Sequence, residues 1–232
     1  MNAPCILALD TATDVCSVAL HRGTSMTARS ETVGQSHSAR ALPMVDELLR
    51  DAGATLRDLD FVAFGAGPGS FTGLRIACGL AQGLAWGAGK RVIPVGNLHA
   101  LAARVLQLAS DVDTVFCAID ARMHEAYCAL YRRGDDVAEL RAPTLARPDE
   151  LAALADGADA IAGDALTAFP DAWSRATSRR FPSLRADAAD IARLAATPAG
   201  LARAVEAAAA APLYVRDHVA LTIAERRARA AA

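Results

Sequence analysis

The stretch Phe61-Val-Ala-Phe-Gly-Ala-Gly-Pro-Gly-Ser-Phe-Thr-Gly-Leu-Arg75 decides more about the fold than any other part of the chain. Its first four residues are apolar and predict a short buried strand, which a run of glycines and a proline then ends. Apolar residues recur at helical spacing from there to Gly87-Ala-Gly89, and Thr72 is the side chain expected to cap this helix. The stretch therefore predicts a strand, a glycine loop and a helix.

A loop of this kind brings backbone N–H groups to a helix N-terminus, where they can receive a phosphate. The standard motifs do not fit. A Walker loop needs a lysine, and none occurs before Lys90, while the dinucleotide fingerprint needs a glycine where Thr72 stands. Ser70 lacks the flanking glycines of a nucleophile elbow. The alternative is that the glycines only permit a tight turn and close packing of the helix on the sheet, and both interpretations stay open.

Composition indicates an ordinary protein without a charged partner surface. The 232 residues are 53% hydrophobic, and the formal charge is -2, from 24 basic and 26 acidic residues that are interspersed. A protein that binds nucleic acid by itself usually has a basic face. The first ten residues, Met1 to Asp10, resemble neither a signal peptide nor a membrane span, so we expect a cytoplasmic location and no membrane partner.

The cysteines and histidines give no sign of a metal site. Five cysteines lie among apolar residues without a Cys-x-x-Cys pair, which predicts buried, reduced thiols. The five histidines are scattered, and no two have the spacing of a zinc motif.

A repeated hairpin suggests an internal duplication. Residues 5–10 form an apolar run that ends in Asp10, a turn follows, and residues 15–20 are apolar again. Residues 115–120 form a second apolar run, which ends in Asp120, 110 residues after Asp10, and the same hairpin pattern follows it. Such a duplication predicts two similar domains that face each other, although two matched hairpins can also arise by chance.

Two helices of the first half carry unusual residues. The segment 36–53 predicts a helix with Gly53 as its C-cap, and Pro43 is tolerable only if the helix begins close before it. Met44 lies off the main apolar stripe and predicts a second contact face on this helix. In the next helix the glycines at positions 79, 83 and 87 each lower helix propensity by about 1 kcal/mol, which predicts a bare groove for another helix.

The remaining segments are weaker signals. A strand at 90–95 and a helix at 97–108 close the first half, and Pro148 opens a short helix. A small-residue strand and turn follow at 160–164, then an alanine-rich helix at 187–210, broken at Pro198. Thr222-Ile-Ala-Glu225 has capping-box spacing ahead of a basic tail. We expect an N-terminal subdomain over 1–107 and a more divergent C-terminal subdomain over 108–232.

The order of these features resembles one known family, the bacterial TsaB (YeaZ) proteins. The resemblance is dense over the first 130 residues and thin from about 135 to 210. The run from Gly65 to Arg75 is its most specific part. The segments that carry the rest are Leu9-Asp-Thr-Ala-Thr13, Ser36-His-Ser, Leu42-Pro-Met44, Ile93-Pro-Val95, Ile119-Asp-Ala-Arg122, Glu125, Tyr127 and Tyr214-Val-Arg216.

The resemblance implies an α/β fold of two duplicated halves, shared by sugar kinases, heat-shock ATPases and actin (the ASKHA fold), each half with a mixed sheet and helices. It also implies a catalytic paralogue, TsaD, whose two metal-binding histidines follow a Pro-Val pair. Aligned on Pro94-Val95, those positions fall on Asn97 and Leu101, with His99 between them. Neither residue replaces an imidazole ligand, so we expect a scaffold that lacks the metal.

The implied role is a non-catalytic activator that binds the TsaD-like transferase, which forms threonylcarbamoyladenosine beside the anticodon of tRNA. A TsaE-like ATPase is expected to dock on the pair, and the free chain is expected to form a homodimer. Contact with tRNA is expected only through the complex. The implied partner surface lies on the two helices of the first half and comprises Leu42, Met44, Val45, Leu48, Leu49, Ile76, Leu80, Gly83 and Leu84.

An alternative hypothesis is a magnesium-dependent ATPase or small-molecule kinase that uses the cleft. Its phosphate site would comprise Asp10, Gly67, Gly69 and Ser70, and its adenosine loop would be the faint candidate Ala162-Gly-Asp-Ala165. No cofactor is expected to be required by the chain alone, and ATP or ADP belongs to the complex. A metallopeptidase, as some superfamily members were once labelled, would need ligands that the sequence does not supply.

Overall fold

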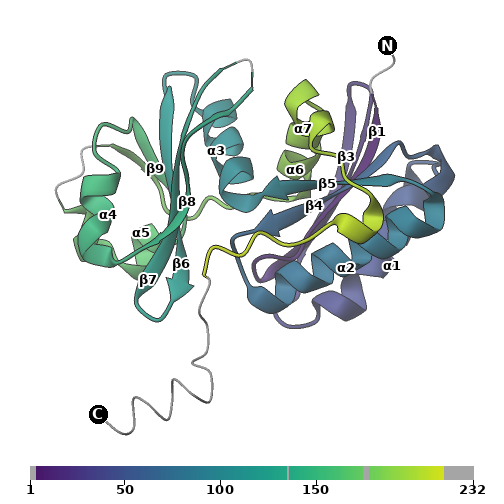
Figure 1. The fold of residues 1–232 in the computed structure, drawn as a ribbon, viewed down its shortest axis with the longest axis horizontal. Helices are drawn as coiled ribbons and strands as arrows, with labels where there is room; N and C mark the ends of the chain where they lie inside the picture. The colour runs from purple at the N-terminus through teal and green to yellow at the C-terminus, as the bar shows by residue number, and fades with distance from the viewer. Residues whose placement is uncertain (1–3, 135, 175–177, 217–232) are drawn as a thin grey trace, which may run out of the picture.

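The structure is a computed structural model that describes residues 4–134, 136–174 and 178–216. It consists of two halves, each built on a five-stranded sheet, with helix α3 between them (Figure 1). The proposed capping box at 222–225 and the basic tail lie outside the described residues, as do the first three residues.

The first sheet contains three antiparallel strands followed by two parallel ones. Its spatial order is β3-β2-β1-β4-β5, and β1, β4 and β5 run parallel. The strands are β1 (Cys5–Asp10), β2 (Val15–Arg22), β3 (Ser25–Thr32), β4 (Phe61–Gly67) and β5 (Arg91–Gly96).

The second sheet repeats this topology. Its order, read from the far edge, is β8-β7-β6-β9-β10, again with three antiparallel strands and then parallel pairing. The strands are β6 (Thr114–Arg122), β7 (Glu125–Arg132), β8 (Ala138–Ala146), β9 (Ala160–Ala162) and β10 (Arg179–Phe181). The two sheets thus match strand for strand, which confirms the duplicated α/β architecture expected from the repeated hairpin.

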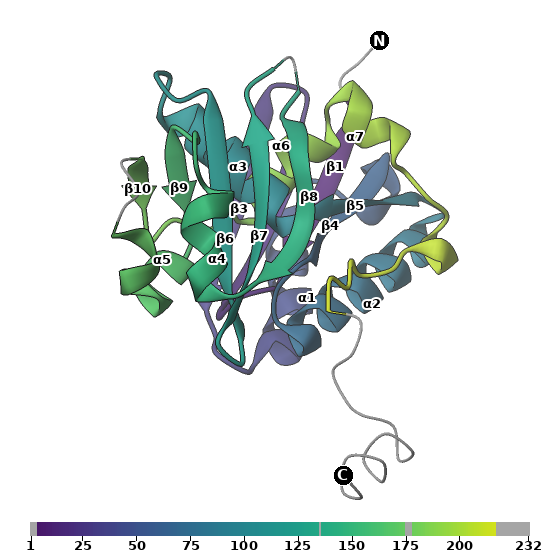
Figure 2. The ribbon, with the colours of Figure 1, turned by 60° about the vertical axis from the view of Figure 1, so that its left-hand side comes forward.

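Helices cover both faces of each sheet. The longer ones are α1 (His37–Asp51), α2 (Phe71–Ala88), α3 (Asn97–Leu108) and α6 (Ala188–Ala195). The shorter ones are α4 (Pro148–Leu154), α5 (Ala165–Ala168) and α7 (Pro198–Ala202), with 3-10 turns η1 (Leu56–Asp58), η2 (Pro170–Trp173) and η3 (Ala207–Ala209). Figure 2 shows α4 lying over the second sheet, on the side away from the first half.

Alternation along the strands divides the first half into two cores. In β1, Leu7 and Leu9 face α1 and α2, whereas Ile6 and Ala8 face α6. Because successive side chains of a strand point to opposite faces, a strand buried on both sides reads as one continuous apolar run. The second sheet is divided in the same way between α3 on one face and α4, α5 and η2 on the other.

The sequence predicted most of these elements, with a few errors. Ser70, not Thr72, is the N-cap of α2, because the Ser70 hydroxyl accepts a hydrogen bond from the N–H of Gly73 at 3.4 Å. Pro43 is the seventh residue of α1 and not near its start, and it lies on the exposed side, where the carbonyl that loses a partner can meet water. Met44 is fully buried in the core, so the second contact face predicted for it is wrong.

Helix α6 comes from the second part of the sequence but packs on the first sheet. Its Ile191 and Ala192 belong to the same core as Ile6 and Ala63. Residue Val205 then pairs with Val92 at the edge of β5. The division of the chain at 107/108 stays a prediction, and it does not describe these returning segments.

Three further observations concern the cysteines, groups that could bind a metal ion, and the apolar character of the helices. All five cysteines are buried and free, as expected. Within the described ranges, no group of three or more His, Cys, Asp or Glu side chains is placed to hold a metal ion. None of the helices in those ranges has both the length and the apolar composition to cross a membrane.

Candidate functional site

The glycine loop between β4 and α2 packs tightly against the turn between β1 and β2. The N–H of Ser70 donates to the carbonyl of Ala12 at 2.9 Å, and the Thr11 hydroxyl donates to the carbonyl of Gly73 at 2.7 Å. A Cβ atom at Gly73 would lie 1.9 Å from the Thr11 carbonyl oxygen, and one at Gly69 would lie 2.8 Å from the Ala12 Cβ. Close approach of two backbones therefore explains these glycines.

Asp10 is buried beneath the loop and is hydrogen-bonded within the chain. Its Oδ1 accepts from Asn97 Nδ2 at 3.0 Å and from the N–H of Ala12 at 3.1 Å, and only 2% of the residue is exposed. The Asn97 side chain also accepts from the N–H of Gly67 at 2.7 Å. Burial raises the pKa of Asp10 to about 6, against the lowering effect of the Asn97 hydrogen bond. A Cβ at Gly65 would lie 2.3 Å from Asp10 Oδ1, which leaves no room for a side chain.

The segment 210–216, which we call the C-terminal strap, covers the loop from outside (Figure 1). The N–H of Leu213 donates to the carbonyl of Ala66 at 2.7 Å, and the Leu213 carbonyl lies 2.8 Å from where a Cβ of Gly67 would be. On α2, the Gln82 side chain donates to the carbonyl of Ala210 at 2.9 Å. The strap therefore occupies space directly above the glycine loop.

The end of the strap connects the two halves. Tyr214 packs against Phe71 with ring centroids 5.7 Å apart, and its hydroxyl accepts from Arg75 Nε at 3.0 Å. Two residues later, Arg216 forms an ion pair with Glu125 at 2.8 Å and donates to the carbonyl of Ala121 at 3.1 Å. Tyr214 thus binds the first half and Arg216 binds the β6–β7 hairpin of the second.

These contacts bear on whether the glycine loop is a phosphate site or a tight turn that serves packing. The N–H groups of Gly67 and Ser70 already donate to protein acceptors, and the strap lies over Gly67. A phosphate would have to displace these bonds before it could use the same donors. The geometry therefore favours the packing interpretation, and a phosphate site at Asp10, Gly67, Gly69 and Ser70 stays an untested prediction.

The faint adenosine loop of the second half is packed in the same manner. A Cβ at Gly163 would lie 2.1 Å from the Ala118 carbonyl oxygen, and the φ of Gly163 is +116°. Asp164 Oδ1 accepts from the N–H of Asp120 at 2.8 Å, which ties the end of β6 to the loop after β9. Gly163 and Asp164 therefore hold the loop after β9 against the end of β6.

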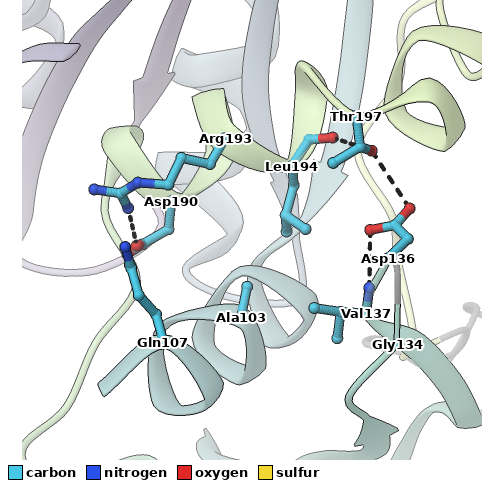
Figure 3. A pocket seen from close by; sticks show the side chains of 9 residues that line it. All are labelled: Ala103, Gln107, Gly134, Asp136, Val137, Asp190, Arg193, Leu194 and Thr197. Atoms are coloured by element: carbon cyan, nitrogen blue, oxygen red, sulfur yellow. Dashed lines mark hydrogen bonds and ion pairs between the residues drawn. The ribbon is translucent and has the colours of Figure 1, made fainter. Parts of the chain in front are cut away.

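A hollow of about 200 Å³ lies between α3, α6 and the β7–β8 connection (Figure 3). The charged side chains that line it already have partners. Asp190 accepts a hydrogen bond from Arg193 at 2.8 Å and from Arg104 at 3.0 Å, and the Thr197 hydroxyl contacts Asp136 at 3.3 Å. A charged ligand would therefore have to displace these pairs.

The nine expected partner-surface residues fall into two groups. The buried group, with exposures of 0 to 7%, belongs to the core under α1 and contains Met44, Val45, Leu48 and Leu49. The accessible group contains Leu42, which is 43% exposed, the half-buried Ile76, Leu80 and Leu84, and the exposed Gly83. Only the second group is available to a partner.

Some surface residues were not assigned by the sequence. Trp86 is 75% exposed on α2, and Phe71 is 52% exposed at its start. The signal that would have found them is their helical position outside the buried stripe of α2 that Leu74, Ala77 and Ala81 form. Arg122, Met123 and His124 all have positive φ in the β6–β7 turn, a strained arrangement for residues with side chains. No local pattern in the sequence indicates that strain.

The comparisons with known proteins agree on one family. The family model described as TsaD, tRNA N6-adenosine threonylcarbamoyltransferase, matches residues 29–228. A Haemophilus influenzae protein named tRNA threonylcarbamoyladenosine biosynthesis protein TsaB is 49% identical over 122 residues, which is 53% of this chain and 51% of that protein. The Escherichia coli protein of the same name is 45% identical over 131 residues, 56% of each chain. The match thus spans about half the length of these curated relatives.

Two solved structures from Pseudomonas aeruginosa extend the likeness over the whole fold. One, described as similar to the peptidase YeaZ, is 35% identical with a TM-score of 0.85, covering 92% of this chain and all of the other. The second, described as YeaZ, is also 35% identical, with a TM-score of 0.83, and covers 91% of this chain and 99% of the other. The chain therefore belongs to the TsaD family and, within it, to the TsaB (YeaZ) group.

Proposed function

We propose that the chain takes part in the synthesis of threonylcarbamoyladenosine in tRNA as a non-catalytic scaffold. Its partner is a TsaD-like transferase subunit, which it binds and activates. The names of the Haemophilus influenzae and Escherichia coli relatives support the pathway, and the family model supports a transferase of related fold as the partner.

The observation that carries the proposal is the open glycine stripe on α2. A Cβ added at Gly79, Gly83 or Gly87 would meet nothing within 4 Å, so nothing in the described part of the chain fills this space. Three glycines in a helix cost about 3 kcal/mol of helix propensity relative to alanine. A partner helix that approaches closely at the stripe would offset that cost.

The proposed absence of catalysis is supported by the positions where a TsaD-like protein would hold its metal. Asn97 binds Asp10 and Gly67 with its side chain, so its amide is already used within the fold. Leu101 is buried in the core of the second half. An amide held in place and a leucine offer no imidazole-like ligand.

Gly83→Glu tests the surface. The residue is exposed and meets open space, so we expect the variant to fold but to lose binding to the TsaD-like subunit in a pull-down with purified proteins. Leu108→Glu, at an exposed leucine on α3 away from the stripe, serves as the matched control and should bind normally. Full complex formation by Gly83→Glu would show that the surface is misplaced.

The alternative function, a magnesium-dependent ATPase or kinase, is tested by calorimetry of the chain with Mg-ATP. Because the strap covers Gly67 and Asp10 is buried, we expect no micromolar binding and no turnover. Micromolar binding would favour the enzyme over the scaffold.

The remaining partners follow from the same proposal. A TsaE-like ATPase docks on the assembled pair, ATP or ADP acts at the level of that complex, and tRNA is contacted through it. Because tRNA modification of this kind takes place where tRNA is matured and used, we place the chain in the cytoplasm.

A further inference from the structure

The β6–β7 turn contains one more left-handed residue than its geometry requires. Arg122, Met123 and His124 have φ angles of 63°, 55° and 60°, which are unfavourable for residues with a side chain. A two-residue hairpin turn of this hand needs two such positions. Because Arg122 pairs with Glu125 across the hairpin, Met123 and His124 fill them. Arg122 is therefore left-handed for a reason that lies outside the turn.

The peptide group between Ala121 and Arg122 is held from both sides. Its carbonyl accepts from Arg216 Nη2 at 3.1 Å, and its N–H donates to Asp120 Oδ1 at 2.8 Å. Since a peptide group is planar, its carbonyl and its N–H rotate together, and their direction determines the φ of Arg122. Asp120 belongs to the same strand, but Arg216 belongs to the C-terminal strap. The strap thus contributes to the conformation of Arg122.

Arg216 contacts the chain before, within and after the turn. Besides the Ala121 carbonyl, its guanidinium group contacts the Met123 Sδ at 3.2 Å and forms the ion pair with Glu125 at 2.8 Å. The guanidinium is a planar fork, so these contacts share one fixed arrangement of donors. A strained backbone conformation persists only where its surroundings over-determine it. Arg216 supplies that restraint from a distant part of the chain.

The same strap covers the glycine loop of the first half. The Leu213 N–H donates to the Ala66 carbonyl at 2.7 Å, and the Leu213 carbonyl lies 2.8 Å from where a Cβ of Gly67 would be. Leu213 and Arg216 are three residues apart, which is at most about 10 Å of extended chain. Movement of the strap away from Gly67 therefore also disturbs the contacts of Arg216.

We propose that the strap is a two-state switch that couples the glycine loop of the first half to the β6–β7 turn of the second. In the docked state, the strap covers Gly67 and holds the Ala121–Arg122 peptide group so that Arg122 is left-handed. In the released state, Gly67 is uncovered, the peptide group rotates, and Arg122 takes an ordinary right-handed or extended conformation. The strain at Arg122 exists only in the docked state, so it favours release.

This switch is a property of the chain alone and does not depend on the proposed transferase partner. Its test uses the full chain and compares Arg122→Gly with Arg122→Ala. Both substitutions remove the exposed ion pair with Asp120, but only glycine adopts the left-handed conformation without a steric penalty. The two variants therefore differ in the backbone strain of the docked state.

The measurement is hydrogen exchange at the Leu213 N–H, which follows release of the strap. We expect this amide to exchange about 5-fold more slowly in Arg122→Gly than in Arg122→Ala, as for about 1 kcal/mol of relieved strain. Amides of β1 should exchange at the same rate in both variants, because their hydrogen bonds lie within the first sheet.

A second measurement follows the turn itself. The ¹³Cα and ¹³Cβ chemical shifts of a residue distinguish a left-handed backbone from an ordinary one. In Arg216→Ala we expect the shifts of Arg122 to leave the left-handed range. Those of Met123 and His124 should stay in it, because the hairpin turn requires both positions to be left-handed.

Two results would overturn the proposal. Equal exchange of the Leu213 amide in Arg122→Gly and Arg122→Ala would show that strain at this position is not linked to the strap. Unchanged Arg122 shifts in Arg216→Ala would show that Asp120 fixes the peptide group without the strap.

Discussion

Single glycines in this chain have opposite roles that only the structure separates. In α2, a Cβ at Gly73 would strike the Thr11 backbone, whereas one at Gly87 would meet open space. The sequence offered helical periodicity for the whole segment and could not tell which glycine faces a neighbouring turn, because that turn is some 60 residues away in the chain.

Matched alanine substitutions should show this difference. We expect Gly73→Ala to lower the free energy of unfolding by more than about 2 kcal/mol, since the backbone must shift to admit the methyl group. Gly87→Ala should raise it by up to about 1 kcal/mol through helix propensity. Denaturant unfolding of both variants at low protein concentration measures the effect, and equal shifts in both would contradict the packing account.

Protonation of Asp10 should make the free energy of unfolding depend on pH. The pKa of this carboxyl is about 6 in the folded chain, above its ordinary value of 3.8, because burial disfavours the charged form. The folded state thus binds the proton more tightly, so its stability relative to the unfolded state falls as the pH rises from about 4 to about 6.

Asp10→Asn removes this titration while keeping an oxygen that can accept the bonds from Asn97 and Ala12. We compare the free energy of unfolding of the wild type with that of the variant. The difference, wild type minus variant, should fall by up to about 3 kcal/mol between pH 4 and pH 7. Unfolding curves at four pH values between these limits measure it. A difference that stays constant with pH would show that the Asp10 pKa is not raised.

At the scale of elements, α1 shows how far a periodic pattern can be trusted. Its apolar residues predicted a helix, and the helix is present, but the pattern did not separate core from surface. Leu48 is fully buried and Leu42 is 43% exposed, although both were expected at a partner surface. An apolar stripe at least about 100° wide carries three to four residues in every two turns, and the position of the sheet decides which of them face inward.

Two charge substitutions on α1 should therefore behave differently. Leu48→Glu places a carboxylate in the core, so we expect loss of the cooperative unfolding transition at 25 °C. Leu42→Glu should leave the fold intact, with less than about 1 kcal/mol of change in stability. Circular dichroism with thermal denaturation distinguishes them, and a folded Leu48→Glu variant would contradict the assignment of Leu48 to the core.

Other elements show which signals the sequence carries. The strand, glycine loop and helix of residues 61–88 were predictable, because glycines interrupt two clearly apolar patterns. Strand β3, with the sequence Ser25 to Thr32, was missed because it is a polar edge strand without alternation. The strap was missed as a structural element because its contacts with Ala66 and Gly67 join segments far apart in the chain.

At the scale of the whole molecule, the strap should limit movement between the halves. Its last contact, the ion pair of Arg216 with Glu125, is largely shielded from water, with the Arg216 side chain 13% exposed. Arg216→Ala removes this anchor on the second half but leaves Tyr214 on the first. We expect faster hydrogen exchange at the Leu213 N–H, by about 10-fold or more, because the strap opens more often.

The control for this effect is the exchange rate of amides in β1 and β4, which should not change, since their hydrogen bonds lie within the sheet. If the Leu213 amide exchanges at the wild-type rate in Arg216→Ala, the contacts of Tyr214 and Ala210 hold the strap without help from the second half.

The returning helix α6 has a consequence for synthesis on the ribosome. When the nascent polypeptide has emerged only as far as residue 107, the sheet of its first half still lacks the helix that covers Ile6, Ala8, Ala63 and Ile93. The covering residues, Ile191 among them, are translated some eighty codons later. The apolar face of the amino-terminal half therefore stays uncovered until α6 has been synthesised.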